Sequence, residues 1–257
     1  MGPLLDIAGQ SVARRVASCY ARRDERRATS VAVAVALTVL LVPSAGRAHD
    51  FWVERAGEGF AVRYGHLGGE ALAIDASKVK AIRCGDGARP PRDVVGARSS
   101  SPTEVRFSAR CAVVSVLHDG GNWSLTPDGE VNLPRSRVEN VVRSWVSRQY
   151  AKWVDAKSPG AGAVLGDDLE LVPVTDLAKA RNGDKITVRL LSAGRPVPNA
   201  VVAVGHHPLG ETDSKGEIRL RLRDPLESIS TSIRRPGATP EADTEVLEAS
   251  LTFEVGR

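Results

Sequence analysis

The sequence predicts a mainly β protein made of two antiparallel, immunoglobulin-like β-sandwich domains with one amphipathic helix between them. Three observations support this fold class. Short apolar stretches alternate with Gly, Pro and Ser turns along the first half of the chain, as in an antiparallel sheet. A capping box followed by apolar residues at helical spacing lies in the middle. A second set of strand-like segments fills the last third.

Residues 1–48 have the features of a secretory signal peptide. The apolar run VAVAVALTVLLV (31–42) has twelve residues, fewer than the ~20 that a membrane-spanning helix needs. Arginines precede this run and small residues ending at Ala48 follow it, which predicts cleavage after Ala48. The alternative is an uncleaved membrane anchor, which requires the apolar run to extend to Ala45. We therefore expect a periplasmic or secreted protein that does not span the membrane after cleavage.

Removal of this leader changes the charge of the chain. The whole sequence carries 35 basic and 31 acidic residues, and the leader contains seven of the basic and three of the acidic ones. The remaining chain therefore carries 28 of each and is formally neutral. Because a nucleic-acid-binding protein needs a basic face in its working domain, this class is excluded.

Residues 49–134 are expected to form the N-terminal β domain. After cleavage the chain keeps only Cys84 and Cys111, 27 positions apart. An even pair in an exported chain predicts one disulfide, and two unrelated buried thiols are the alternative. No CxxC pattern is present, so the sequence does not support a thiolate zinc site or a redox motif. The strand-like segments of this domain are FAVRYG (60–65), KVKAIRC (78–84) and TEVRFSARCAVVSVLHDGGNW (103–123).

Residues 135–168 are expected to form an amphipathic helix and a linker. Ser136 and Glu139 match the capping box that begins many helices. The residues that follow include apolar and aromatic side chains at helical spacing. A stripe of this kind indicates a packing face rather than a ligand site. GAGAVLG (160–166) lacks the spacing of a nucleotide-binding loop and is interpreted as a flexible linker. The apolar residues at helical spacing are Val138, Val142, Trp145, Val146, Tyr150 and Trp153.

Residues 169–257 are expected to form the C-terminal β-sandwich domain. In EIRLRL (217–222), apolar residues alternate with charged ones, which is typical of a strand with one solvent-exposed face. The other strand-like segments are LELVPV (169–174), GDKITVRLL (183–191), NAVVAVG (199–205), SISTSI (228–233) and ASLTFEV (249–255).

Several segments resemble one exported bacterial family. They are AHDFWVE (48–54), ELVPVTD (170–176), GDKITVRLLSAGRPVPNAVV (183–202), TDSKGE (212–217) and ASLTFEV (249–255). The family comprises domains of unknown function formerly described as the periplasmic component of nickel uptake systems. The resemblance implies an exported, β-rich accessory protein that passes nickel, cobalt or copper to a membrane metal transporter. The C-terminal half also resembles sandwiches of the transthyretin or carboxypeptidase-regulatory type.

The first residue after the predicted cleavage site is a histidine. The α-amine and Nδ1 of His49 would chelate one metal ion, and a second imidazole would complete an all-nitrogen site that suits Cu(II) or Ni(II). We rank His66 first as the partner, because it follows a glycine at a strand end. His206 and His207, at the end of NAVVAVG, rank second. His118 precedes a DGGN segment and is interpreted as a residue that caps a turn.

Two functions from different classes therefore follow from the sequence. The first is a divalent-metal-binding accessory protein. The second is a non-catalytic module that contacts a cell-envelope partner or a glycan, in which His49 is only the consequence of where the peptidase cuts. No nucleophile–base pair or carboxylate pair is evident, so an enzyme is not expected.

Overall fold

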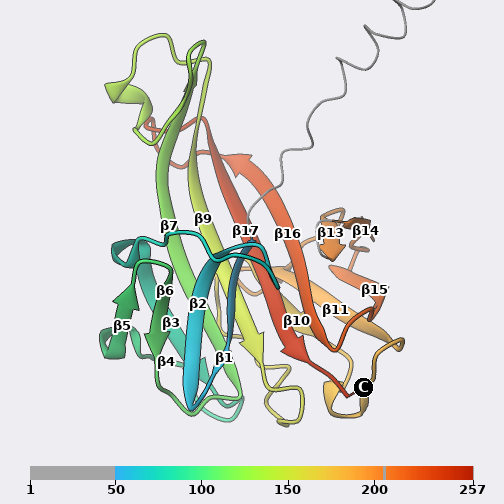
Figure 1. Cartoon of the computed structure of the whole chain (residues 1–257). Coiled ribbons are helices and arrows are strands. Elements are labelled where there is room, and N and C mark those ends of the chain that lie inside the picture. The colour runs from blue at the N-terminus through green and yellow to red at the C-terminus, as the bar shows by residue number, and fades with distance from the viewer. Residues whose placement is uncertain (1–49, 205–206, 257) are drawn as a thin grey trace, which may run out of the picture. The chain divides into compact units, whose positions relative to one another are not determined.

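A nine-stranded mixed sheet runs through the centre of the structure, a computed structural model that describes residues 50–204 and 207–256 (Figure 1). Its strand order is β14-β13-β16-β17-β9-β7-β3-β4, with β8 paired to β7. The predicted leader, His49 and His206 lie outside the described residues. The strands of this sheet are β3 (Val79–Gly85), β4 (Arg92–Asp93), β7 (Val113–Thr126), β8 (Gly129–Val131), β9 (Arg143–Val154), β13 (Val201–Val204), β14 (His207–Glu211), β16 (Leu226–Pro236) and β17 (Thr244–Glu254).

Two four-stranded sheets accompany the central sheet. The N-terminal one has the order β1-β2-β6-β5, with strands β1 (Asp50–Ala56), β2 (Gly59–Gly65), β5 (Arg98–Ser101) and β6 (Glu104–Phe107). In the C-terminal one, β11 pairs with β10, β12 and β15. Its strands are β10 (Glu170–Pro173), β11 (Lys185–Ser192), β12 (Arg195–Pro196) and β15 (Glu217–Arg221).

The predicted amphipathic helix is wrong. Residues Arg143–Val154 form β9, a strand that runs antiparallel to β7 and parallel to β17. Ser136 does not cap a helix, because its hydroxyl donates to the Glu241 carboxylate at 2.5 Å. Among residues 50–204 and 207–256 the helical elements are four 3-10 turns, and none is long and apolar enough to cross a membrane. These turns are η1 (Ala76–Lys78), η2 (Val95–Ala97), η3 (Arg135–Arg137) and η4 (Leu177–Lys179).

The helix was predicted wrongly because the last five residues of β9 are buried on both faces of the sheet. From Tyr150 to Val154 every residue is buried, so the alternation of buried and exposed positions that marks a half-exposed strand is lost. Val138 and Val142, which completed the helical stripe, lie before β9. The aromatic and β-branched residues of β9 suit a strand in the middle of a sheet.

Most of the predicted strands are confirmed. FAVRYG, KVKAIRC and GDKITVRLL correspond to β2, β3 and β11, and the C-terminal segments SISTSI and ASLTFEV lie within the longer β16 and β17. The solvent-exposed face of β15 is also confirmed, because Leu220 is buried while Arg219 and Arg221 are exposed. The fold is therefore mainly β, as expected.

The central sheet is shared between the two predicted domains. β7 belongs to the predicted N-terminal domain, β9 to the segment expected to form the helix and linker, and β17 to the predicted C-terminal domain, yet β9 pairs with both β7 and β17. One apolar core, with Phe60, Ile82 and Trp153, lies between the N-terminal sheet and the central sheet. A second core, with Leu190, Leu247 and Phe253, lies between the C-terminal sheet and the central sheet. Residues 160–166, interpreted as a linker, form a loop in which Ala161 and Leu165 are buried.

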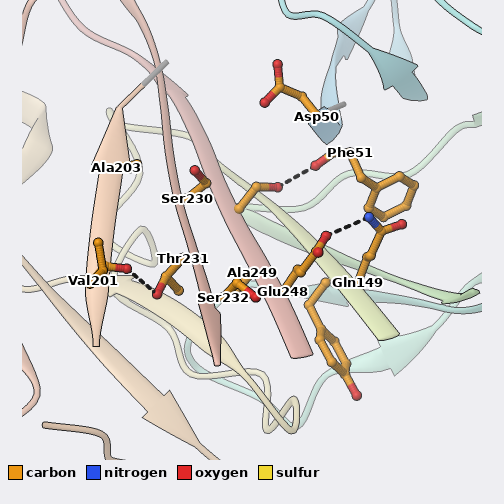
Figure 2. Close-up of a pocket in the computed structure, with 12 residues that line it drawn as sticks. Asp50, Phe51, Gln149, Val201, Ala203, Ser230, Thr231, Ser232, Glu248 and Ala249 are labelled. Atoms are coloured by element: carbon orange, nitrogen blue, oxygen red, sulfur yellow. Dashed lines mark hydrogen bonds between the residues drawn. The ribbon is translucent and has the colours of Figure 1, made fainter. Parts of the chain in front are cut away.

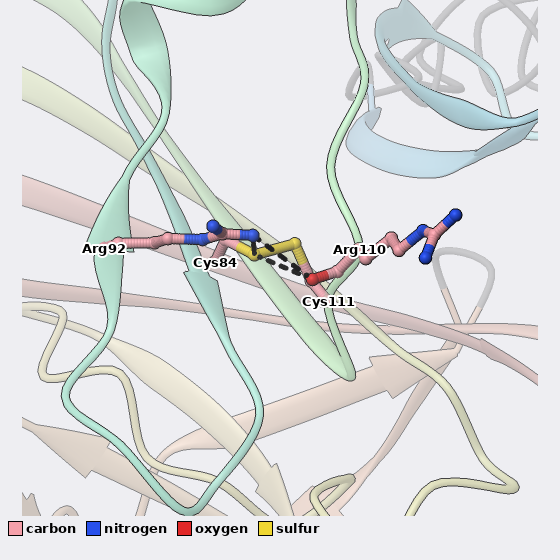
Figure 3. The surroundings of a disulfide bond; sticks show 4 residues. All are labelled: Cys84, Arg92, Arg110 and Cys111. Atoms are coloured by element: carbon pink, nitrogen blue, oxygen red, sulfur yellow. Dashed lines mark hydrogen bonds between the residues drawn. A yellow bond between two sulfur atoms is a disulfide. The ribbon is translucent and has the colours of Figure 1, made fainter.

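The predicted Cys84–Cys111 disulfide is present (Figure 3). The two Cα atoms lie 5.4 Å apart, inside the range that a disulfide needs. Cys84 belongs to β3, whereas Cys111 belongs to the segment that leads into β7 and not to a strand. The Arg92 guanidinium lies beside the bridge and donates to the Arg110 carbonyl at 3.5 Å. The bridge therefore joins β3 to the start of its neighbour β7.

A buried ion pair fixes the loop 155–169 to β9. The side chains of Lys152 and Glu170 are 2% and 1% exposed, and Nζ lies 2.6 Å from the carboxylate. Lys152 also donates to the Ala163 carbonyl at 2.8 Å, and Glu170 accepts from the backbone N–H of Leu165 at 2.7 Å. Since every charge has partners, the pair holds the loop in one conformation at little net electrostatic gain.

Asp167 lies beside this pair. Its carboxylate accepts from the Ser115 hydroxyl and lies 2.9 Å from the Arg83 guanidinium. Burial raises the pKa of Asp167 to about 6, while the Ser115 hydrogen bond opposes the rise and the Glu170 carboxylate adds to it. Asp167 therefore takes up a proton in the folded protein at a higher pH than it does in the unfolded chain.

We expect the double variant Cys84→Ser/Cys111→Ser to lose about 2–4 kcal/mol of unfolding free energy, because the bridge restricts a loop of 27 residues in the unfolded chain. Urea unfolding of the oxidised wild type and of the variant measures the difference. Wild type treated with a reductant is the control and is expected to unfold like the variant. Equal stability of oxidised wild type and variant would contradict the expectation.

We expect Lys152→Met to cost about 3–5 kcal/mol, because it leaves the Glu170 carboxylate buried without its cation. The matched variant Lys152→Met/Glu170→Leu removes both charges and is expected to recover most of that loss. Urea unfolding at neutral pH tests both. A double variant no more stable than the single one would show that the hydrogen bonds of Glu170 to the loop, rather than charge pairing, are the source of the effect.

The raised pKa of Asp167 predicts a pH dependence of stability. Between its unfolded value near 4 and its folded value of about 6, the folded protein binds more protons, so raising the pH removes stability from the wild type. Relative to Asp167→Asn, we expect the wild type to lose roughly 3 kcal/mol in total as the pH rises from below 4 to above 6, with about 2 kcal/mol of this loss between pH 4 and pH 6. Unfolding of both proteins across this range gives the difference, and a flat difference would disprove the shift.

Candidate functional site

His66 lies immediately after β2, at the end of the β1–β2 pair. The register of this pair places Asp50, the first residue of β1, opposite Gly65. The Asp50 carboxylate accepts the backbone N–H of Leu67 at 3.2 Å, which holds the residues around His66 against the start of β1. The His66 carbonyl accepts the N–H of Gly69 at 2.8 Å and closes a tight turn. His66 is thus held beside the N-terminal end of the first described strand.

Gly65 makes this turn possible. Its φ is +137°, in the region that favours glycine, and a Cβ at this position would lie 2.5 Å from the Glu70 carbonyl oxygen. In the sequence this glycine marks only the end of a strand. The structure shows that a larger residue there would displace the loop that follows His66.

The interpretation of His118 as a turn cap is wrong. Residues Asp119–Asn122 lie inside β7, which continues to Thr126 after a register shift between Asp119 and Gly121. The His118 ring packs against Phe51 of β1 with centroids 5.1 Å apart. Within the described part of the chain, its Nδ1 is buried without a hydrogen-bond partner. Burial lowers the pKa of His118, the Lys78 ammonium lowers it further, and a hydrogen bond with Gln149 opposes them.

Two cavities lie along the face of the central sheet beside β1. The first, of about 300 Å³, is lined by residues of β1, β9, β13, β16 and β17 (Figure 2). The second, of about 460 Å³, extends from the segment after β2 across β7 and β9. Both contain Gln149 and Glu248, whose side chains are joined by a hydrogen bond of 2.7 Å (Figure 2). We call the two cavities together the polar trough.

The polar trough combines aromatic rings with fixed polar groups. Trp123 and Trp145 are opposite each other on β7 and β9, and their rings are nearly parallel, at 8°, with centroids 6.3 Å apart. Burial, and then the charge of Glu248, raise the pKa of Tyr64, so its hydroxyl stays protonated at neutral pH. The trough also holds serine side chains from β16 and β17, namely Ser230, Ser232 and Ser250.

Of the other predicted metal ligands, His49 and His206 lie outside the described residues, and His207 lies on a different strand from His66. His207 is exposed on β14, the edge strand of the central sheet, opposite Val204. Across residues 50–204 and 207–256, no group of three or more His, Cys, Asp or Glu side chains is placed to hold a metal ion. A metal site at His66 would therefore need at least one ligand from outside the described residues.

The polar trough was not predicted from the sequence. Trp145 and Gln149 were expected on a helix, and Glu248 lies 99 positions from Gln149. The pairing of Trp123 with Trp145 is apparent only once residues 143–154 are known to form β9.

Comparison with protein families gives one match. Residues 47–225 match the family described as "Domain of unknown function (DUF4198)". The chain belongs to this family. The match covers all strands of the N-terminal and C-terminal sheets but ends before β16 and β17, which complete the central sheet and one wall of the trough. A search of curated proteins found no match to the chain.

Proposed function

We propose that this member of the DUF4198 family is an exported protein that binds a divalent metal ion, nickel, cobalt or copper, at the N-terminus of its processed chain. In this proposal the protein acts as an accessory component that passes the ion to a membrane metal transporter. The two sheets packed on the central sheet then serve as a rigid, sandwich-like support for the site. The proposal includes cleavage of the leader after Ala48, in the periplasm or on secretion.

The observation that carries the proposal is the register of β1 and β2. The pair ends with Asp50 opposite Gly65, and the next residues outward in the sequence are His49 and His66. Both histidines are therefore sequence neighbours of the last residue pair of this ladder. We propose that the turn after Gly65 and the processed N-terminus bring their nitrogens to one ion.

The chemistry of this donor set fits the proposed ions. Processing would give His49 a free α-amine, so His49 would supply two nitrogens and His66 a third. Nitrogen ligands in a planar arrangement suit Cu(II) and Ni(II). The Asp50 carboxylate, which accepts from Leu67, would hold the His66 loop in place as an outer-shell group.

The rival function is a non-catalytic module that contacts a partner in the cell envelope. The polar trough gives this alternative a specific surface, since it lies beside the same end of β1. In this case the first residue after cleavage has no role as a ligand.

We expect the processed chain to bind one Ni(II) or Cu(II) per molecule, and His66→Ala to weaken binding strongly, because one of three nitrogens is lost. An extra residue ahead of His49 should weaken binding equally, because the α-amine would then be in a peptide bond. Affinity should fall as the pH drops through the histidine range, because protonated imidazoles do not bind metal. Calorimetric titration of each variant measures these effects.

His118→Ala is the matched control and should change affinity little, since His118 lies on β7 rather than in the β1–β2 pair. Intact-mass measurement of protein taken from the cell envelope establishes that the chain starts at His49. If the extended and native forms bind equally, or if the mature chain retains the leader, the N-terminal site is disproved and the envelope module is favoured.

A further inference from the structure

We propose that the polar trough is a saccharide-binding site, in which Trp123 and Trp145 form the platform for a sugar ring, and Gln149 and Glu248 bind its hydroxyl groups. This inference is independent of metal binding. It rests only on residues that the structure describes.

The platform is rigid. Trp123 and Trp145 form a cross-strand pair on β7 and β9, and both side chains are partly exposed and line the larger cavity. The Arg143 guanidinium lies 5.6 Å from the centroid of the Trp145 ring, so the sugar would pack on the ring surface that Arg143 leaves open. The Trp123 indole N–H donates to the Gly120 carbonyl at 3.1 Å, which fixes the orientation of the ring. An indole has a flat apolar face with a negative charge distribution, and the C–H groups on one side of a pyranose ring pack well on such a face.

The polar groups beside the platform are also held in place. The Gln149 amide donates to Glu248 at 2.7 Å and is hydrogen-bonded to His118. Glu248 keeps further acceptor positions because a carboxylate offers about four. The buried Nδ1 of His118 has no partner among the described residues and belongs to a residue that lines the same cavity. A neutral ligand with many hydroxyls, each both donor and acceptor, matches this combination.

The charges of the trough disfavour anionic and purely aliphatic ligands. Its larger cavity is lined by three carboxylates, those of Asp75, Glu130 and Glu248, and by one ammonium, that of Lys78. Lys78 already donates to the Asn132 side chain at 3.0 Å. An anion such as phosphate would therefore meet net negative charge. An aliphatic chain would bury the carboxylates without partners, which is costly.

An organic cation would also satisfy carboxylates and aromatic rings, and is the closest competitor. The smaller cavity favours the saccharide. Beyond the carboxylates of Asp50 and Glu248 it continues along a face that offers the hydroxyls of Ser230 and Ser232, and these have no charge to match a cation (Figure 2). A chain of sugar units extending along the trough would contact both the platform and this serine face.

The test uses the processed, disulfide-bonded chain in buffer with EDTA. The probes are two neutral tetrasaccharides, a β-1,4-linked N-acetylglucosamine tetramer and cellotetraose, with choline as the cation. We expect saturable binding of at least one tetrasaccharide, seen both as a change in tryptophan fluorescence and by calorimetry. Choline should not compete.

Trp145→Ala should lower the affinity about tenfold or more, which corresponds to about 1.4 kcal/mol. Glu248→Gln keeps the shape of the side chain but replaces a charged acceptor with a neutral one. We expect it to lower the affinity less than Trp145→Ala does. Trp123→Phe keeps an aromatic ring and provides a second platform variant if Trp145→Ala does not fold. Val142→Ala, at an exposed position close to Trp145 but outside the cavity lining, is the matched control and should bind like the wild type.

Two outcomes would overturn the inference. One is the absence of binding of either tetrasaccharide at millimolar concentration by folded protein, with or without choline binding. The other is binding that is unchanged in Trp145→Ala and Glu248→Gln, which would place the ligand elsewhere. Because EDTA removes metal ions, neither outcome bears on the N-terminal metal site.

Discussion

The position of β9 between β7 and β17 is the constraint on which the rest of the structure depends. β9 pairs antiparallel with β7 along almost its whole length and parallel with β17 over nine residue pairs, from Thr244↔Trp145 to Thr252↔Trp153. Since its Trp153 contributes to one apolar core and its Val154 to the other, both packed layers meet at this strand. The last strand of the chain therefore closes a sheet begun in its first half.

The same constraint explains why a lysine is fully buried. Lys152 lies on β9 at the point where the loop 155–169 crosses the sheet, and its ammonium bonds both to Glu170 and to a backbone carbonyl of that loop. An apolar residue would fill the space but would not select one path for the loop. We interpret the pair as a device for conformational specificity, in keeping with the small net contribution of buried ion pairs to stability.

The polar trough occupies the part of one face of the central sheet that the N-terminal sheet leaves uncovered. The N-terminal sheet covers β3, β7 and β9 there, and its β1 packs against β9 and β17 (Figure 1). Ser250 of β17 donates to the Phe51 carbonyl at 2.6 Å and attaches this edge of β1 to the sheet. The trough lies beside β1, and His66 lies at the end of the same strand pair. The two proposed activities therefore use neighbouring surfaces, although each has its own test.

The sequence by itself determined the β class, most strand positions and the disulfide partners. Each of these follows from local information: alternating side chains in EIRLRL, glycine and proline turns, and a single pair of cysteines beyond the predicted leader. Only the tertiary structure decided that residues 143–154 are a strand, because burial on both faces removes the local period that would show it. It also decided the site, since Gln149 and Glu248 are 99 positions apart and meet only through the parallel pairing of β9 with β17. Pairing between strands that are distant in the sequence leaves no local pattern in either strand, so this pairing cannot be predicted from either segment alone.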